Sequence, residues 1–158
     1  MSSSIADAGT FDSESLRHAI AVVDAVLLKN DAWCNLEFES LDDSADSGQS
    51  LFGFLAARGP ANPLATIMGP SAGRSSRPVE VGIQHQAGVK AARQLVEAGI
   101  ELLDGGRVIQ DHPRRGLVVR CPDSVTADAI VSWLFPAMRE LSRAPRTGVV
   151  RYATSVVG

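Results

Sequence analysis

Two short segments of this chain gather residue types that could bind or transform a ligand. In the first segment, His85, Gln86 and Gly88 lie between an expected strand and an expected helix. Free backbone amides and the positive end of a helix dipole attract anions at such a junction, and glycine lets a ligand approach the backbone. This junction is therefore a candidate site for a small anionic ligand, and the alternative is an ordinary strand-to-helix turn.

The second segment is a charged stretch that contains Asp111, His112, Arg114 and Arg115. Arginine forks pair with carboxylates and phosphates, and a histidine beside them could donate a proton. The same segment also suits a solvated hairpin turn, because Asp, Pro and Gly favour turns. The sequence therefore predicts either an anion-binding site or a simple turn at this position.

The chain lacks the signatures that would identify a reaction. It contains no nucleophile elbow, no Walker-type phosphate loop and no dinucleotide-binding glycine pattern. Its three histidines are not spaced to share a metal ion, and no cysteine joins them at ligand spacing. We therefore expect no metal, no cofactor and no assigned catalytic residue. A small enzyme that uses His85 and His112 is an alternative.

The stretch 81–100 resembles the opening of an ACT-type regulatory domain, in which a strand, a glycine-ended loop and a helix precede the next strand. This resemblance implies a ligand-sensing domain that binds an amino acid at a subunit interface. The matching residues are Gly88, Val89, Leu95, Glu97, Gly99 and Ile100.

Charge is unevenly distributed along the chain, with a net charge of −7 over residues 1–70 and +4 over residues 71–158. Opposite charges attract, so the two parts are expected to face each other within one chain or between two chains. An association of this kind should weaken as salt rises. The expected central strands contain no aromatic residue for base stacking, so we expect no nucleic-acid partner.

The remaining composition bears on the cellular compartment. No apolar run approaches the ~20 residues that span a bilayer, and the first residues do not form a secretory signal. Cys34 and Cys121 lie in separate apolar segments, which favours buried free thiols over a disulfide. The sequence therefore predicts a cytoplasmic protein that does not contact a membrane.

Hydrophobic periodicity predicts the elements that would position the two candidate segments. Helical spacing of apolar residues predicts a helix over 13–29, alternation predicts a strand over 33–39, and a second helix is expected over 49–58. The Pro- and Gly-rich stretch 59–78 is expected to be a loop, in which 64–68 could form a short strand. The expected order after residue 78 is strand 79–84, helix 88–98, strands 107–110 and 116–121, a long helix after 122–124, and strand 148–155.

This order is typical of the ferredoxin-like split β-α-β arrangement. We therefore predict an α+β fold with a disordered tail over 1–11 and a single domain over 12–158. That domain comprises a helix–strand–helix extension (12–58), a loop (59–78) and a ferredoxin-like core (79–155). Helices on one face of the sheet leave the other face open, so cover or self-association is expected.

These features favour a non-enzymatic binding or interaction domain over an enzyme. The expected partner is another protein or a second copy of the chain, as a homo-oligomer or an adaptor. A small-molecule anion or amino-acid sensor is the first alternative, and the enzyme built on the histidines is the second.

Overall fold

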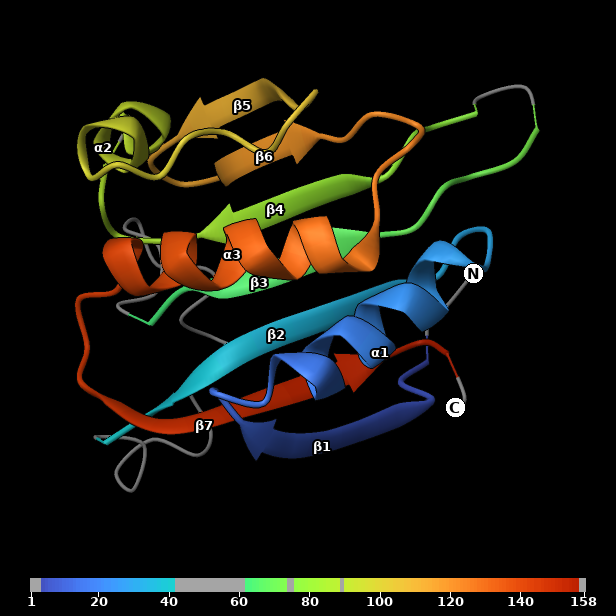
Figure 1. The fold of residues 1–158 in the computed structure, drawn as a ribbon, viewed down its shortest axis with the longest axis horizontal. Helices are drawn as coiled ribbons and strands as arrows, with labels where there is room; N and C mark the ends of the chain where they lie inside the picture. The colour runs from blue at the N-terminus through green and yellow to red at the C-terminus, as the bar shows by residue number, and fades with distance from the viewer. Residues whose placement is uncertain (1–3, 42–61, 74–75, 89, 157–158) are drawn as a thin grey trace.

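The computed structural model describes residues 4–41, 62–73, 76–88 and 90–156. Within these ranges the chain forms a seven-stranded sheet in the order β1-β7-β2-β3-β4-β6-β5, together with three helices (Figure 1). All neighbouring strands are antiparallel. The elements in chain order are β1 (Asp7–Asp12), α1 (Leu16–Leu27), β2 (Trp33–Ser40), β3 (Leu64–Met68), β4 (Glu80–Gln84), α2 (Ala91–Glu97), β5 (Arg107–His112), β6 (Gly116–Arg120), α3 (Ala127–Leu141) and β7 (Arg146–Thr154).

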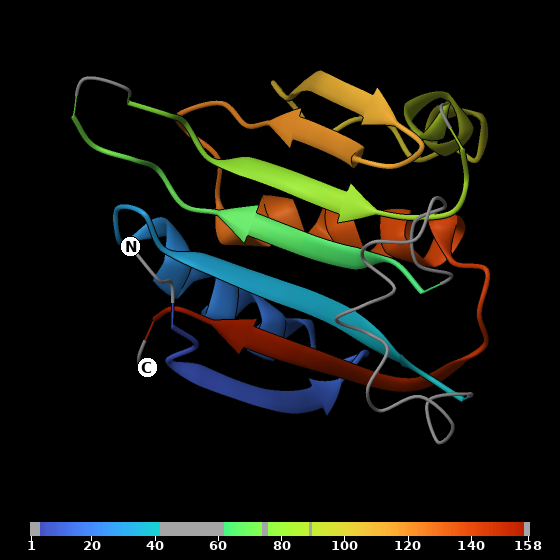
Figure 2. The ribbon, with the colours of Figure 1, turned by 180° about the vertical axis from the view of Figure 1, so that it is seen from behind.

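The molecule has two layers. Helices α1 and α3 cover one face of the sheet, and the opposite face carries none of the described helices (Figures 1 and 2). We call this opposite surface the open face; Asn35, Thr66, Gly82 and Val118 lie on it. The core lies between the sheet and the helices, so residues alternate between buried and half-buried along β2, β3 and β4. None of the described helices is long and apolar enough to cross a membrane.

Helix α3 is the centre of the helical layer because it packs against both the sheet and α1. Its start is capped by Thr126, whose Oγ1 accepts a hydrogen bond from the backbone N–H of Ala129 at 3.1 Å. Arg139 lies in the last turn, where a positive charge complements the helix dipole. Phe135 packs edge-on against Phe38 of β2, with the ring centroids 5.6 Å apart. These contacts fix α3 across the middle of the sheet.

The prediction of a ferredoxin-like core is wrong. Strands β4, β6 and β5 lie in the order that such a core requires, but the last strand of that fold would pair with β4. That place is taken by β3, which forms a hairpin with β4, and β7 lies between β1 and β2 (Figure 1). The connection 69–79 between β3 and β4 is much shorter than the stretch 85–145 between β4 and β7, so its closure costs less entropy. In its observed position β7 places Val150 opposite both Phe11 and Phe38, so three buried apolar side chains meet.

The N-terminal part does not form a separate extension, because its strands belong to the same sheet. Residues 1–11 were expected to be a disordered tail, whereas Asp7–Asp12 form the edge strand β1. Phe11 anchors this strand, because it is buried and stacks on the ring of His18 at 4.8 Å. The helix expected over 49–58 lies outside the described residues.

The sheet also joins the acidic and basic parts of the sequence. Because β7 pairs with β2, Arg151 lies 3.7 Å from Glu37. Arg139 lies 3.6 Å from Glu14, just before α1. Such partly exposed pairs each contribute at most about 1 kcal/mol to stability. Ion pairs within one chain therefore account for part of the attraction between the acidic and basic parts of the sequence.

The structure confirms that both cysteines are buried free thiols. Burial raises the pKa of the Cys34 thiol to about 12 and that of the Cys121 thiol to about 11. The charge of Glu80 adds to the rise in the pKa of Cys121. Neither thiol is therefore suited to act as a nucleophile at neutral pH.

Candidate functional site

The two segments that the sequence singles out lie at the same end of the sheet. Strand β4 ends at Gln84 and β6 begins at Gly116, and Ile83 is paired with Leu117 between them. Gly116 allows this approach, because its φ is 77° and a Cβ there would lie only 2.3 Å from the carbonyl oxygen of Ile83. The hairpin tip 112–115 therefore lies beside the loop that follows β4.

His85 is wholly buried and stabilises that loop. Its Nδ1 accepts a hydrogen bond from the backbone N–H of Ala87 at 3.1 Å, so the neutral ring carries its proton on Nε2. Nε2 is buried and has no partner within the part of the chain that the structure describes. Burial lowers the pKa of His85, and the negative charge of Asp111 opposes that shift. In this conformation His85 does not reach a molecule in solution.

Asp111 contacts the beginning of α2. Its Oδ2 accepts a hydrogen bond from the backbone N–H of Ala92 at 3.1 Å. A carboxylate at a helix start is favourable, but it places negative charge where the sequence predicted a bound anion. In the same loop Gly88 makes the turn, with a φ of 98°, and the side chain of Gln86 is exposed.

The hairpin tip is closed by His112. Its Nδ1 accepts hydrogen bonds from the backbone N–H groups of Arg114 at 3.1 Å and Arg115 at 3.4 Å. These two amides are therefore already paired, while the side chains of both arginines are exposed. Arg115 lines a hollow on the open face, and Arg114 does not line that hollow.

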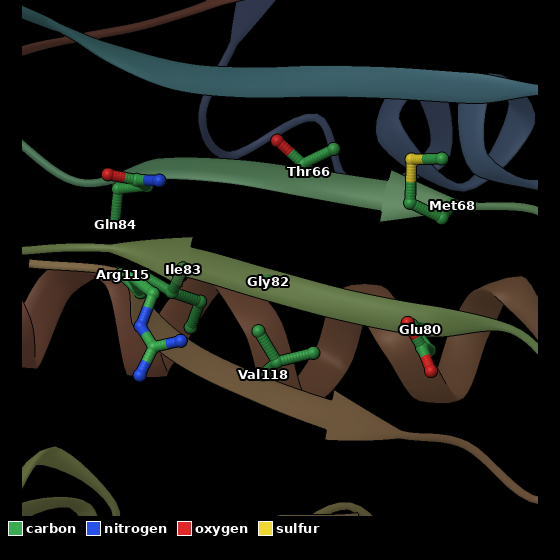
Figure 3. A pocket seen from close by; sticks show the side chains of 8 residues that line it. All are labelled: Thr66, Met68, Glu80, Gly82, Ile83, Gln84, Arg115 and Val118. Atoms are coloured by element: carbon green, nitrogen blue, oxygen red, sulfur yellow. The ribbon is translucent and has the colours of Figure 1, made fainter. Parts of the chain in front are cut away.

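That hollow is a groove of about 220 Å³ across β3, β4 and β6 (Figure 3). Its centre is Gly82, which is paired with Thr66 on one side and Val118 on the other. The groove exists because Gly82 has no side chain in a row where its neighbours do. The remaining lining residues are Met68, Glu80, Ile83, Gln84 and Arg115.

The two ends of the groove differ in charge. At one end, Glu80 accepts hydrogen bonds from the guanidinium of Arg120 at 2.8 and 3.1 Å, so its charge is balanced. At the other end, beside Gln84, Arg115 forms no salt bridge with a described residue. Figure 3 shows Glu80 and Arg115 at opposite ends of the row. The positions of Glu80 and Gln84 on β4 imply a separation of about 13 Å.

A second hollow of about 260 Å³ adjoins the groove on the same face, over β7, β2 and β3. Its lining includes Asn35, Glu37 and Arg151. Thr66 of the groove donates a hydrogen bond from its Oγ1 to Oδ1 of Asn35 at 2.8 Å, and this contact lies between the hollows. Together the hollows extend over five adjacent strands, or about 19 Å at the usual strand spacing.

Sequence reasoning identified Arg115 but missed the groove. One signal was present, because Glu80, Gly82 and Gln84 alternate along a predicted strand and Gly82 interrupts the row. A glycine inside a strand often marks a place where another backbone or a ligand approaches closely. Thr66 could not be placed beside Gly82 without knowing that β3 pairs with β4.

Within the described ranges, no group of three or more His, Cys, Asp or Glu side chains could hold a metal ion. No known protein family, curated protein or solved structure matches this chain.

Proposed function

We propose that this chain is a binding domain that holds an extended segment of a partner protein across its open face. The observation that carries the proposal is the pair of adjoining hollows over five strands. Small-molecule sites are usually single concave pockets of about 300–1,000 Å³, and each hollow is smaller than that range. A long and shallow surface suits an extended polypeptide better than a compact metabolite.

The lining residues indicate the chemistry of the partner segment. Gly82 lets a side chain of the partner approach the sheet, and Met68 and Val118 offer apolar contacts to it. Gln84 can donate and accept hydrogen bonds, and Arg115 can pair with a carboxylate. We therefore expect the partner segment to contain an apolar residue. An Asp or Glu should lie within about four extended residues before or after it.

Two observations favour this proposal over anion sensing and over catalysis. Three backbone amides of the two candidate segments, those of Ala87, Ala92 and Arg114, already donate hydrogen bonds to side chains of the chain itself. His85, which a catalytic site would need, is wholly buried. The two buried free thiols, Cys34 and Cys121, support a reducing compartment, so we propose a cytoplasmic location.

Self-association is the second candidate, and the two edges of the sheet favour it. The edge strand β1 carries Asp7 and Asp12, whereas the opposite edge strand β5 carries Arg107 together with Asp111, whose carboxylate accepts a hydrogen bond from the start of α2. Complementary edges of this kind could join two copies of the chain. Light scattering at low and high salt tests the idea: we expect association that weakens as salt rises, and a monomer at every salt concentration would contradict it.

The main proposal is tested by selecting random peptides on the immobilised full chain and measuring their affinity by fluorescence anisotropy. Arg115→Glu should weaken the selected peptides by about tenfold or more, because it replaces an attraction by a repulsion. Arg114→Glu is the matched control, since Arg114 is also exposed but does not line the groove. A peptide whose acidic residue is changed to Lys should regain affinity for Arg115→Glu. Equal effects of the two arginine variants would contradict the proposal.

A further inference from the structure

Helix α2 is the shortest of the described helices, and its start is held from outside the helix. It has seven residues, and a helix of this length is marginal in water without tertiary contacts. Its N-cap residue, Lys90, makes no side-chain hydrogen bond to the first turn. The carboxylate of Asp111 in β5 takes this role by accepting a hydrogen bond from the N–H of Ala92 at 3.1 Å. The beginning of α2 therefore depends on a side chain of another element.

The turn that leads into α2 is held by the neutral form of His85. The ring is wholly buried, and its Nδ1 accepts a hydrogen bond from the N–H of Ala87 at 3.1 Å. A proton on Nδ1 would make this nitrogen a donor, so the hydrogen bond would be lost and two N–H groups would face each other. The protonated ring would also bring a positive charge into a buried position, which is unfavourable. Protonation of His85 therefore removes the contact that shapes this turn.

A proton on His85 would also act on the cap of α2. Asp111 lies near enough for its negative charge to oppose the burial-driven fall in the pKa of His85. Oδ1 of Asp111 and Nε2 of His85 are both buried, and neither has a partner among the residues that the structure describes. A positively charged ring would attract this carboxylate in competition with the N–H of Ala92. Protonation of one residue thus weakens both attachments at the start of α2.

Asp111 is the charged group that acts on His85. The hairpin tip, α2 and the end of α3 lie around the end of β4, from which the chain continues into His85 (Figure 1). None of their other titratable or charged side chains forms a hydrogen bond or salt bridge with His85 within the described ranges. These side chains are His112, Arg114 and Arg115 of the hairpin tip, Lys90, Arg93 and Glu97 at α2, and Arg139 and Glu140 of α3. The pair of His85 and Asp111 therefore sets the response to acid.

We infer that His85 and Asp111 form an acid-sensitive switch, in which protonation of His85 releases α2 while the rest of the fold stays in place. Helix α2 packs mainly on α3 and β5, so its release leaves the central strands of the sheet paired. Ala91 and Leu95, the buried side chains of α2, become exposed in the released form. The switch thus presents an apolar surface at acid pH. This inference does not depend on the binding of a partner protein at the open face.

Amide hydrogen exchange of the full chain, followed by NMR between about pH 7 and pH 5, tests this inference. The N–H groups of Gln94 and Ala98 report on α2, because they donate to the carbonyl oxygens of Lys90 and Gln94. They should be less protected than the N–H groups of Leu36 and Phe38 in β2, which exchange only when the whole fold opens. Below pH 6.5, the usual pKa of a histidine, the protection of Gln94 and Ala98 should fall about tenfold per pH unit after correction for intrinsic exchange, because the released form binds a proton that the docked form does not. Protection of α2 that equals that of β2 at every pH, or that does not change with pH, would overturn the inference.

Two matched variants provide the second test. His85→Asn keeps a side-chain acceptor for the N–H of Ala87 but has no group that titrates in this range, so the fall in protection of α2 should disappear. His112→Asn is the control, because Nδ1 of His112 likewise accepts the N–H of the residue two positions on, Arg114, but at the hairpin tip; here the fall should remain. A fall that survives in His85→Asn, or that is lost in His112→Asn, would contradict the switch. The comparison of α2 with β2 in the wild-type chain does not depend on how well either variant folds.

Discussion

A substitution that fills the groove at Gly82 tests the role of the open face most directly. The backbone of Gly82 is not in the positive-φ region, so any residue can adopt its conformation. A Cβ placed there would lie 3.8 Å from Cγ2 of Val118 and 3.9 Å from the carbonyl oxygens of Leu117 and Thr66. These are ordinary van der Waals distances. Gly82→Val should therefore fit the strand and fill the centre of the groove.

The variant should be at least as stable as the wild-type chain. Glycine inside a strand costs about 0.5–1 kcal/mol relative to alanine, and valine favours the extended backbone. Removing the glycine penalty should therefore raise the free energy of unfolding of Gly82→Val by about 0.5–1 kcal/mol. Urea unfolding followed by circular dichroism measures this change.

Binding should change in the opposite direction. Peptides selected on the wild-type chain should lose about tenfold or more in affinity for Gly82→Val, which corresponds to about 1.4 kcal/mol. Thr10→Val is the control, because Thr10 is exposed on the edge strand β1 and lies outside both hollows. Unchanged affinity in a folded Gly82→Val protein would refute the assignment of the groove. A loss of stability would refute the packing argument.

Three further predictions concern Gly116, His85 and the two cysteines. Gly116→Ala should destabilise the fold by about 1–3 kcal/mol in urea unfolding, because its Cβ would meet the carbonyl oxygen of Ile83; a neutral effect would contradict the close approach of β6 to β4. The pKa of His85 is lowered from 6.5 in the folded state, so the unfolded chain binds more protons below pH 6.5, and stability should fall as pH drops from 6.5 towards the lowered pKa. His85→Asn, which keeps an acceptor for the loop amide, should reduce that pH dependence, and an unchanged pH profile would contradict the role given to His85. Cys34 and Cys121 should react with a thiol reagent at neutral pH only after unfolding, and rapid reaction of the native protein would contradict their burial.

Much of the secondary structure could be predicted from local patterns, but the fold could not. Alternation identified the strand that became β2, and the turn residues around 111–115 marked the hairpin between β5 and β6. The pairing of β7 depends on distant contacts, such as Val150 with Phe11 and Phe38, which no local pattern reveals. Strand β3 is short and lies in a stretch rich in proline and glycine, so its pairing with β4 was not foreseen.

The candidate site, like the fold, could be predicted from the sequence only in part. Arg115 was singled out for its charge, and it does line the groove. His85 was singled out for its position before a helix, yet it turns inward because its Nδ1 accepts the N–H of Ala87. The centre of the groove lies at Gly82, which has no side chain. Gly82 forms a groove only because side chains of the two paired strands flank it, and the sequence does not show which residues those are. Residue type alone therefore indicated the rim of the site and not its centre.

The central claim is that a partner polypeptide lies on the open face, and a map of the bound peptide tests it most directly. Backbone amide signals of the full chain should be recorded with and without a selected peptide. The account predicts that the largest changes occur at Thr66, Gly82 and Val118 and extend to Asn35 in the adjoining hollow. Changes confined to the helical face, with these four residues unaffected, would contradict it.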